Sequence, residues 1–160
     1  MKRLSALLIA LWLGMQIGFL AASLVLFNQL LKEDAGRIAG ILFHITNLMG
    51  LVTWAVAWLA CRPSVPSWGD GRYQGRGRRR MIVLMLALLA TAEFVINPVI
   101  HALKHGQSHV LSNLIGGGFG AWHGTSYILY LIISFLGLIL AFLLLRLLSL
   151  IHISEPTRPL

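Results

Sequence analysis

The sequence predicts an all-α integral membrane protein, a four-transmembrane-helix bundle with both termini cytoplasmic. Hydrophobic residues make up 58% of the 160 residues and charged residues only 11%, whereas soluble domains carry roughly 25% charged residues. The mean hydropathy is +0.81. The apolar residues fall into four long runs, and a helix needs about 20 such residues to cross a bilayer. A chain of this length is expected to hold a single membrane domain over residues 1–147, without a separate soluble module.

The predicted helices span residues 4–28, 38–60, 81–102 and 119–147. The first is expected to stay uncleaved, because its apolar run is too long for a signal peptide and Phe19 and Leu20 are unsuitable three residues before a cleavage site. A short polar connection without net charge precedes the second helix. A loop rich in glycine, proline and arginine at 61–80 precedes the third, and such a composition argues against regular structure. Residues 103–118 are mixed and allow a short interfacial helix before the unbroken, leucine-rich fourth run.

The distribution of basic residues predicts the orientation of the chain. The formal net charge is +8, and six of the thirteen Lys and Arg residues lie in the loop 61–80. Because short cytoplasmic loops carry an excess of Lys and Arg, this loop and both termini are expected on the cytoplasmic side of a bacterial inner membrane. The same arginines allow contact with anionic lipids. Since topology accounts for the basic charge, no nucleic-acid partner is expected.

The last part of the chain is set aside. Residues 148–159 resemble a translated sequencing adapter, so 148–160 is expected to be a non-native tail. Segments of this kind are excluded from reasoning about the fold. His152 and Glu155 therefore receive no role.

A polar face within the third apolar run is the most informative pattern. Glu93, Asn97 and His101 recur every fourth residue and so share one face of a helix. Glu93 lies about 18 Å from the start of the helix, near the middle of a ~30 Å bilayer core. An ionisable group at this depth is costly unless it is paired or neutral. Pro98 cannot donate its backbone nitrogen, which predicts an irregularity in the helix.

Two polar residues of other helices extend this face into a predicted intramembrane cluster. Gln16 lies at mid-depth in the first helix, where an amide should face protein. His123 lies one turn into the fourth helix, where it is expected to face the interior within reach of Asn97. The cluster comprises Glu93, Asn97, His123 and Gln16, and it fits either helix packing or a functional site.

Three histidines suggest an alternative site near the outer surface. His44, His101 and His123 are all expected in the outer third of the bundle, and histidines that face one another across a bundle can hold haem or a soft metal. No local ligand motif accompanies them. The alternative reading is that each histidine is a hydrogen-bonding anchor near the membrane surface. Haem b or copper is therefore an alternative cofactor, and none is firmly implied.

Pairs of glycines spaced by four residues predict close helix contacts. Small residues at this spacing let two helix backbones approach each other. The predicted packing positions are Gly14, Gly18, Gly36, Gly40, Gly120 and Gly124.

Several short strings carry a family resemblance. They are FGAWHGTS at 119–126, WLG at 12–14, AGRIAG at 35–40 and NP at 97–98. Together they resemble the transmembrane protein 205-like family, whose bacterial members are a membrane domain of unknown function. The resemblance covers nearly the whole chain up to Leu147 and implies a compact four-helix membrane bundle. A wider similarity to copper resistance protein D and the HemJ-type haem-synthesis oxidases exists only at the level of the fold, which is weak support for a function.

The sequence thus favours a small multi-pass inner-membrane protein, non-enzymatic, with a role in scaffolding or in the handling of a metal or small solute. The alternative is a haem- or copper-binding redox protein that uses His44, His101 and His123, with Glu93 as a proton or charge partner. The lipid bilayer is the expected partner, and a homo-oligomer is compatible with the glycine pairs.

Overall fold

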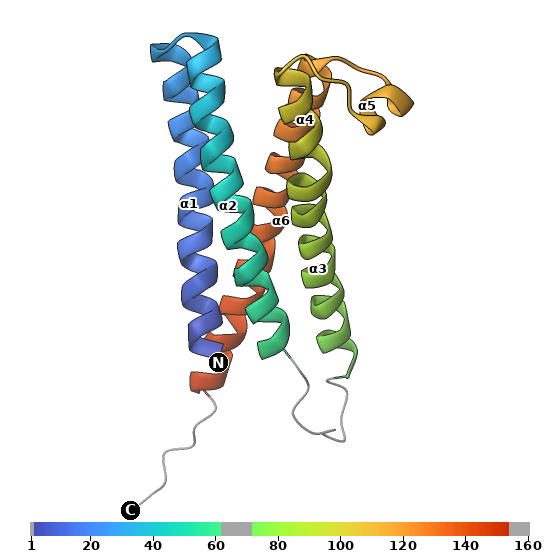
Figure 1. Cartoon of the computed structure of the whole chain (residues 1–160). Helices are drawn as coiled ribbons and strands as arrows, with labels where there is room; N and C mark the ends of the chain where they lie inside the picture. The colour runs from blue at the N-terminus through green and yellow to red at the C-terminus, as the bar shows by residue number, and fades with distance from the viewer. Residues whose placement is uncertain (1, 62–71, 154–160) are drawn as a thin grey trace, which may run out of the picture.

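The chain is an all-α membrane bundle with four spans, as predicted. The computed structural model describes residues 2–61 and 72–153, and these residues are helical apart from short connections. Four stretches are long and apolar enough to cross a membrane, namely Leu4–Gln29, Asp34–Ala60, Arg79–Lys104 and Phe119–Leu143. The first turn of α1 and the last turns of α6 lie at the same end of the bundle (Figure 1), as an even number of spans requires.

The first two spans form an antiparallel pair. α1 (Lys2–Gln29) and α2 (Lys32–Ala60) are separated only by Leu30 and Leu31. The predicted polar connection before residue 38 is therefore wrong, because its charged residues belong to the first turns of α2. Asp34 lies near the start of α2, where the helix dipole favours negative charge, and it pairs with Arg37 at 3.3 Å. Because α2 begins at Lys32 and not at residue 38, each of its residues lies further from the start of the helix, and so deeper in the bundle, than predicted.

The third span consists of three consecutive segments. They are α3 (Arg72–Thr91), the π-helix η1 (Ala92–Ile96) and α4 (Asn97–Lys104). The predicted loop 61–80 is wrong over residues 72–80, which continue α3, while residues 62–71 lie outside the described part of the chain. Arginine and glutamine are good helix formers, and an existing helix extends without a new nucleation step. These two effects outweigh the cost of two glycines in this extension.

The irregularity predicted at Pro98 is present as the π-helix η1. The backbone N–H of Asn97 donates to the carbonyl of Ala92, five residues back. Pro98 lacks the N–H that would reach the carbonyl of Phe94 in a regular helix, so a wider turn just before it is a natural adjustment. A π-turn places one extra residue in the helix and so turns the side chains before it relative to those after it.

The third and fourth spans are joined by a short capped helix. In α5 (Val110–Ile115), His109 Nδ1 accepts from the backbone N–H of Leu111 at 3.2 Å, and Ser112 Oγ accepts from the N–H of His109 at 3.2 Å. Gly116 and Gly117 then adopt positive φ values of 81° and 90°, which L side chains rarely adopt. α6 (Phe119–Ile153) follows. Its last turns include residues 148–153 of the predicted tail, and 154–160 lie outside the described residues.

The core is built around Trp12 of α1. Its ring is 1% exposed and meets the ring of Trp54 edge to face, with centroids 5.6 Å apart. Its indole Nε1 donates to the backbone carbonyl of Thr46 at 3.0 Å. Met85 and Leu89 of α3 complete the contact and are fully buried. The indole thus ties α1 to α2, and α3 packs against the same group.

Two glycines that the four-residue spacing did not select make room for this indole. A Cβ added at Gly50 would lie 2.6 Å from Trp12 Nε1, and one at Gly137 would lie 2.7 Å from Trp12 Cζ3. The six predicted packing glycines have open space instead, with nothing within 4 Å of an added Cβ. They are Gly14, Gly18, Gly36, Gly40, Gly120 and Gly124. The predicted packing role is therefore wrong for contacts within the chain, because spacing fixes a shared helix face but not which face meets another helix.

The orientation of the bundle can be tested with reporter fusions. A fusion after Lys104 should report the periplasm, and one after Gly75 should report the cytoplasm, because the basic residues concentrate at the end of the bundle that holds Gly75. Fusing both alkaline phosphatase and green fluorescent protein at each position gives opposite signals and controls for expression. The reverse pattern would contradict the predicted orientation.

Candidate functional site

A buried carboxyl group lies in the middle of the third span. The side chain of Glu93 in η1 is 5% exposed. Counted at 1.5 Å per residue, it lies about 21 Å from Arg79 and about 16 Å from Lys104, the two ends of the span. An ionisable group at this depth marks a functional site more often than a structural one and needs a partner.

The partner is a histidine of α2. His44 Nδ1 hydrogen-bonds Glu93 Oε1, and the His44 side chain is 47% exposed while that of Glu93 is almost completely buried. His44 lies about 15 Å from Asp34, where α2 enters its span, which matches the depth of Glu93 below Lys104. The pair thus connects a buried carboxyl with an imidazole at the edge of the helix pair.

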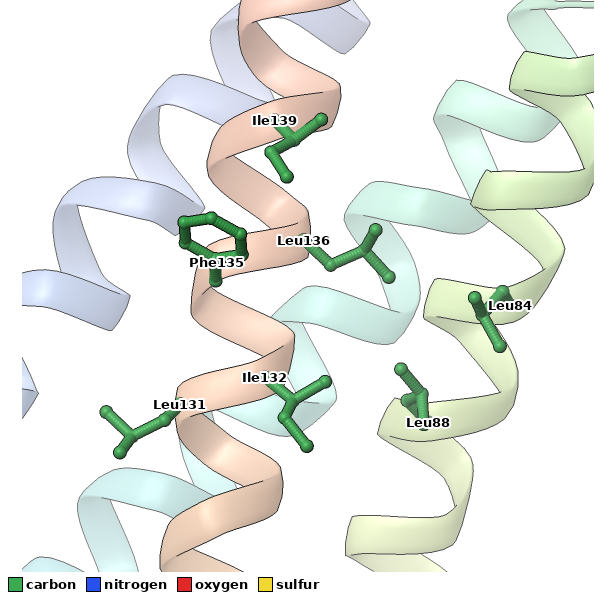
Figure 2. A pocket seen from close by; sticks show the side chains of 7 residues that line it. All are labelled: Leu84, Leu88, Leu131, Ile132, Phe135, Leu136 and Ile139. Carbon is green, nitrogen blue, oxygen red and sulfur yellow. The ribbon is translucent and has the colours of Figure 1, made fainter.

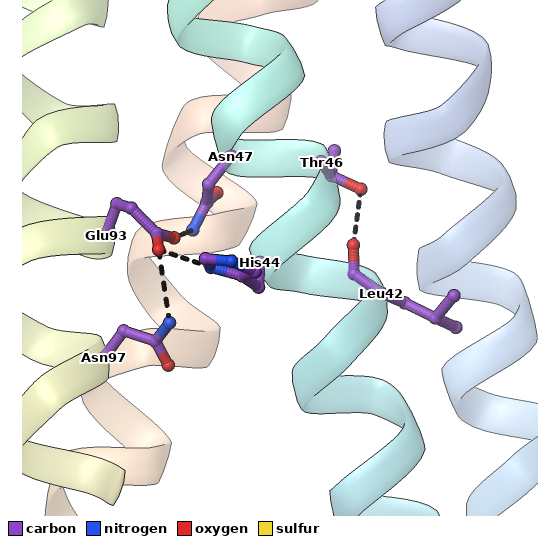
Figure 3. Close-up of polar contacts among 6 residues, drawn as sticks. All are labelled: Leu42, His44, Thr46, Asn47, Glu93 and Asn97. Carbon is purple, nitrogen blue, oxygen red and sulfur yellow. Dashed lines mark hydrogen bonds and ion pairs between the residues drawn. The ribbon is translucent and has the colours of Figure 1, made fainter.

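Two amides complete the surroundings of the carboxyl group. Asn47 Nδ2 donates to Glu93 Oε2 at 3.3 Å, and Asn97 Nδ2 donates to Glu93 Oε1 at 3.5 Å. Figure 3 shows the imidazole and both amides directed at the same carboxyl from α2 and from the third span. Two amide N–H groups thus donate to this carboxyl, and the imidazole of His44 shares a third hydrogen bond with it. We call His44, Asn47, Glu93 and Asn97 the carboxyl site.

The carboxyl site coincides with the π-helix. Glu93 lies in the second position of η1, and Asn97 follows directly after it. On α2, His44 and Asn47 are three residues apart and so project from one face. π-turns within α-helices occur frequently at functional sites, and this one coincides with the most buried acidic side chain among the described residues.

A protein family covers this part of the chain. Residues 7–109 match the family described as a domain of unknown function (DUF4149). The chain belongs to the DUF4149 family. The matched segment runs from α1 into the connection that follows α4, so it contains all four residues of the carboxyl site. No curated protein and no solved structure matches the chain.

In this DUF4149 chain the three candidate metal histidines have separate surroundings. His44 contacts Glu93, His101 packs against His105 with ring centroids 4.6 Å apart, and His123 stacks on Phe119 with centroids 5.6 Å apart. Among the described residues, no group of three or more His, Cys, Asp or Glu side chains could hold a metal ion. The three histidines therefore do not form one metal-binding group among the described residues, while a haem held by two of them stays a prediction.

The four residues of the predicted polar cluster lie in three different places. Glu93 and Asn97 belong to the carboxyl site, whereas His123 stacks on Phe119. Gln16 is fully buried elsewhere and donates to Ser134 Oγ at 2.9 Å. The backbone carbonyl of Gln16 accepts from Tyr130 Oη at 2.8 Å. This second group ties α1 to α6 through neutral hydrogen bonds and has the character of a packing contact.

One residue of the carboxyl site escaped the sequence analysis. Asn47 is 7% exposed and contributes the shorter of the two amide bonds to Glu93. The available signal was its position three residues after His44 on a largely apolar helix, which places both polar groups on one face. That face could be recognised from the sequence, although its partner helix could not.

Proposed function

We propose that this DUF4149 protein handles a small solute in a bacterial inner membrane, and that proton uptake and release at the carboxyl site are coupled to this activity. The observation that carries the proposal is the contact between a carboxyl that is 5% exposed and an imidazole that is 47% exposed. Ionisable residues inside membrane spans commonly belong to proton relays or solute pathways. An imidazole can take up a proton at one nitrogen and release one at the other.

The chemistry of the donors favours a proton over a metal ion. Both amides direct N–H groups at Glu93, and an N–H group cannot ligate a cation. The same N–H groups stabilise the ionised carboxylate, and a proton can pass between Glu93 and His44 along the hydrogen bond that already joins them. The site is therefore suited to hold a proton either on Glu93 or on His44, and the proton can change place without movement of a helix.

Infrared spectroscopy tests proton exchange without knowledge of the solute. Protein in lipid is stepped between about pH 5 and pH 9, a range that brackets the ordinary titration of histidine. We expect a protonated-carboxyl band that grows at low pH and is absent from Glu93→Gln. In His44→Gln the band should shift in frequency, because the carboxyl group has lost the imidazole that is hydrogen-bonded to it. Asp34→Asn, which changes an exposed carboxyl, should leave the band intact.

Proton flux tests whether this exchange serves transport. In proteoliposomes with an inside-negative potential, an entrapped pH dye should report proton uptake by the unaltered protein. Glu93→Gln should slow it by about 100-fold, at the lower end of what a positioned proton-transfer group contributes. A band that does not respond to pH, or a variant that loses only thermal stability and keeps its flux, would make the site a structural contact between α2 and the third span.

A further inference from the structure

An apolar groove lies between α3 and α6, on the surface that faces lipid. Its volume is 460 Å³ and all of its lining residues are apolar, including Leu84 and Leu88 of α3 and Ile132 and Leu136 of α6. Figure 2 shows these side chains flanking the space between the two helices. Leu84 and Ile132 each remain 50% exposed. A groove of this kind inside a membrane span has the right surface for a hydrocarbon chain.

A basic side chain lies on the same face of α3 as the groove. Arg80, Leu84 and Leu88 are spaced by four residues, which places them in one stripe along the helix. Leu84 lies about 6 Å and Leu88 about 12 Å from Arg80 along the helix axis. Arg80 is exposed and stands at the edge of the span that begins at Arg79. The stripe therefore runs from a cation at the membrane boundary into an apolar groove within the span.

The neighbouring arginine is engaged differently. The guanidinium of Arg79 lies 4.8 Å from the centroid of the Trp58 ring, a cation–π contact. Within the described residues, the ion pairs are those of Arg37 with Asp34 and of His44 with Glu93, so no described carboxylate balances Arg80. A cation at the membrane boundary is available to an external anion.

We propose that the groove between α3 and α6 binds one anionic phospholipid, with an acyl chain along Leu84 and Leu88 and the phosphate group at Arg80. Charge complementarity selects this occupant, because a helix of another protein would fill the groove without needing a cation one helical turn away from it. Guanidinium groups bind phosphate oxygens in a bidentate manner. A zwitterionic lipid offers the same chain but carries a compensating positive charge, so it should bind more weakly.

Native mass spectrometry of the full chain tests the proposal with defined lipids. Phosphatidylglycerol should be retained as one bound molecule in preference to phosphatidylcholine with the same chains. Arg80→Gln should lower the retained phosphatidylglycerol by about fivefold, the factor expected for one basic residue near an anionic lipid surface. Leu84→Trp should lower the retention of both lipids, because the larger ring occupies the groove.

Two matched variants serve as controls. Arg37→Gln removes an exposed arginine at the opposite end of the bundle, and Leu7→Trp places the same ring at an α1 position that is 57% exposed and outside the groove. Both should retain phosphatidylglycerol at the level of the unaltered protein. Equal retention of the two lipids, or unchanged retention in Arg80→Gln, would overturn the proposal. A lipid-free dimer that is disrupted by Leu84→Trp would also overturn it and assign the groove to a second copy of the chain.

Discussion

Gly137→Leu is expected to destabilise the folded bundle by about 3 kcal/mol or more, at the upper end of the range for overpacked cores. Even the first added carbon would lie 2.7 Å from Trp12 Cζ3 and 3.0 Å from Trp12 Cη2. The indole cannot move aside easily, because it is held by its bond to the carbonyl of Thr46 and its edge contact with Trp54. α6 would therefore have to separate from α1.

Gly124→Leu is the matched control on the same helix. An added Cβ at Gly124 has nothing within 4 Å, and leucine has a helix propensity up to about 1 kcal/mol better than that of glycine. This variant should be as stable as the unaltered protein or slightly more stable. The partly buried Cys61, the only cysteine in the chain, allows unfolding in detergent to be followed with a thiol-reactive fluorophore. Equal loss of stability in the two variants would contradict the packing described for Trp12.

Asn47→Asp is expected to cost about 4 kcal/mol of stability at neutral pH, the repulsion of two unit charges about 4 Å apart at an effective dielectric constant of about 20. Asn47 Nδ2 lies 3.3 Å from Glu93 Oε2, so the substitution turns a hydrogen-bond donor into a second carboxyl at the same place. At low pH the two carboxyls can share a proton, and the cost should largely disappear. The stability of this variant should therefore fall as the pH rises and the second carboxyl ionises.

Asn47→Leu and Asn113→Asp separate the causes of this effect. Asn47→Leu removes the amide without adding charge, so it should cost about 1–3 kcal/mol for the lost donor and show no new pH dependence. Asn113→Asp makes the same chemical change at an exposed position and should remain within about 0.5 kcal/mol of the unaltered protein. If Asn47→Asp were as stable as Asn113→Asp at neutral pH, Asn47 could not lie against Glu93.

A stable Asn47→Leu variant would also be informative about the proposed function. Glu93 and His44 would keep their mutual hydrogen bond, but the carboxylate would lose one of its two amide donors. In the infrared experiment, we expect the carboxyl band of Asn47→Leu to lie at a different frequency from that of the unaltered protein, because one hydrogen bond to the group is lost.

The sequence by itself determined the four spans and the depth of Glu93 within the third. Both follow from local physics, since the length of each apolar run decides whether a helix can cross a membrane. The position of Glu93 along its apolar run places the carboxyl at a depth where an ionisable group needs a partner. Asn97 could be assigned to the same group for a similar reason, because a spacing of four residues within one helix fixes their proximity.

Only the tertiary structure decided which partners meet. The contact of His44 with Glu93 depends on the axial offset of two helices. A second helix that begins at residue 38, as predicted, instead of at Lys32 places His44 too close to the membrane surface. The rotation of each helix decided that Gly50 and Gly137 pack against Trp12 while Gly124 has open space. Hydropathy and spacing describe one helix at a time. Offset and rotation are set by the fit of side chains between helices, and a π-turn changes that rotation by about 100°, the angle of one helical residue.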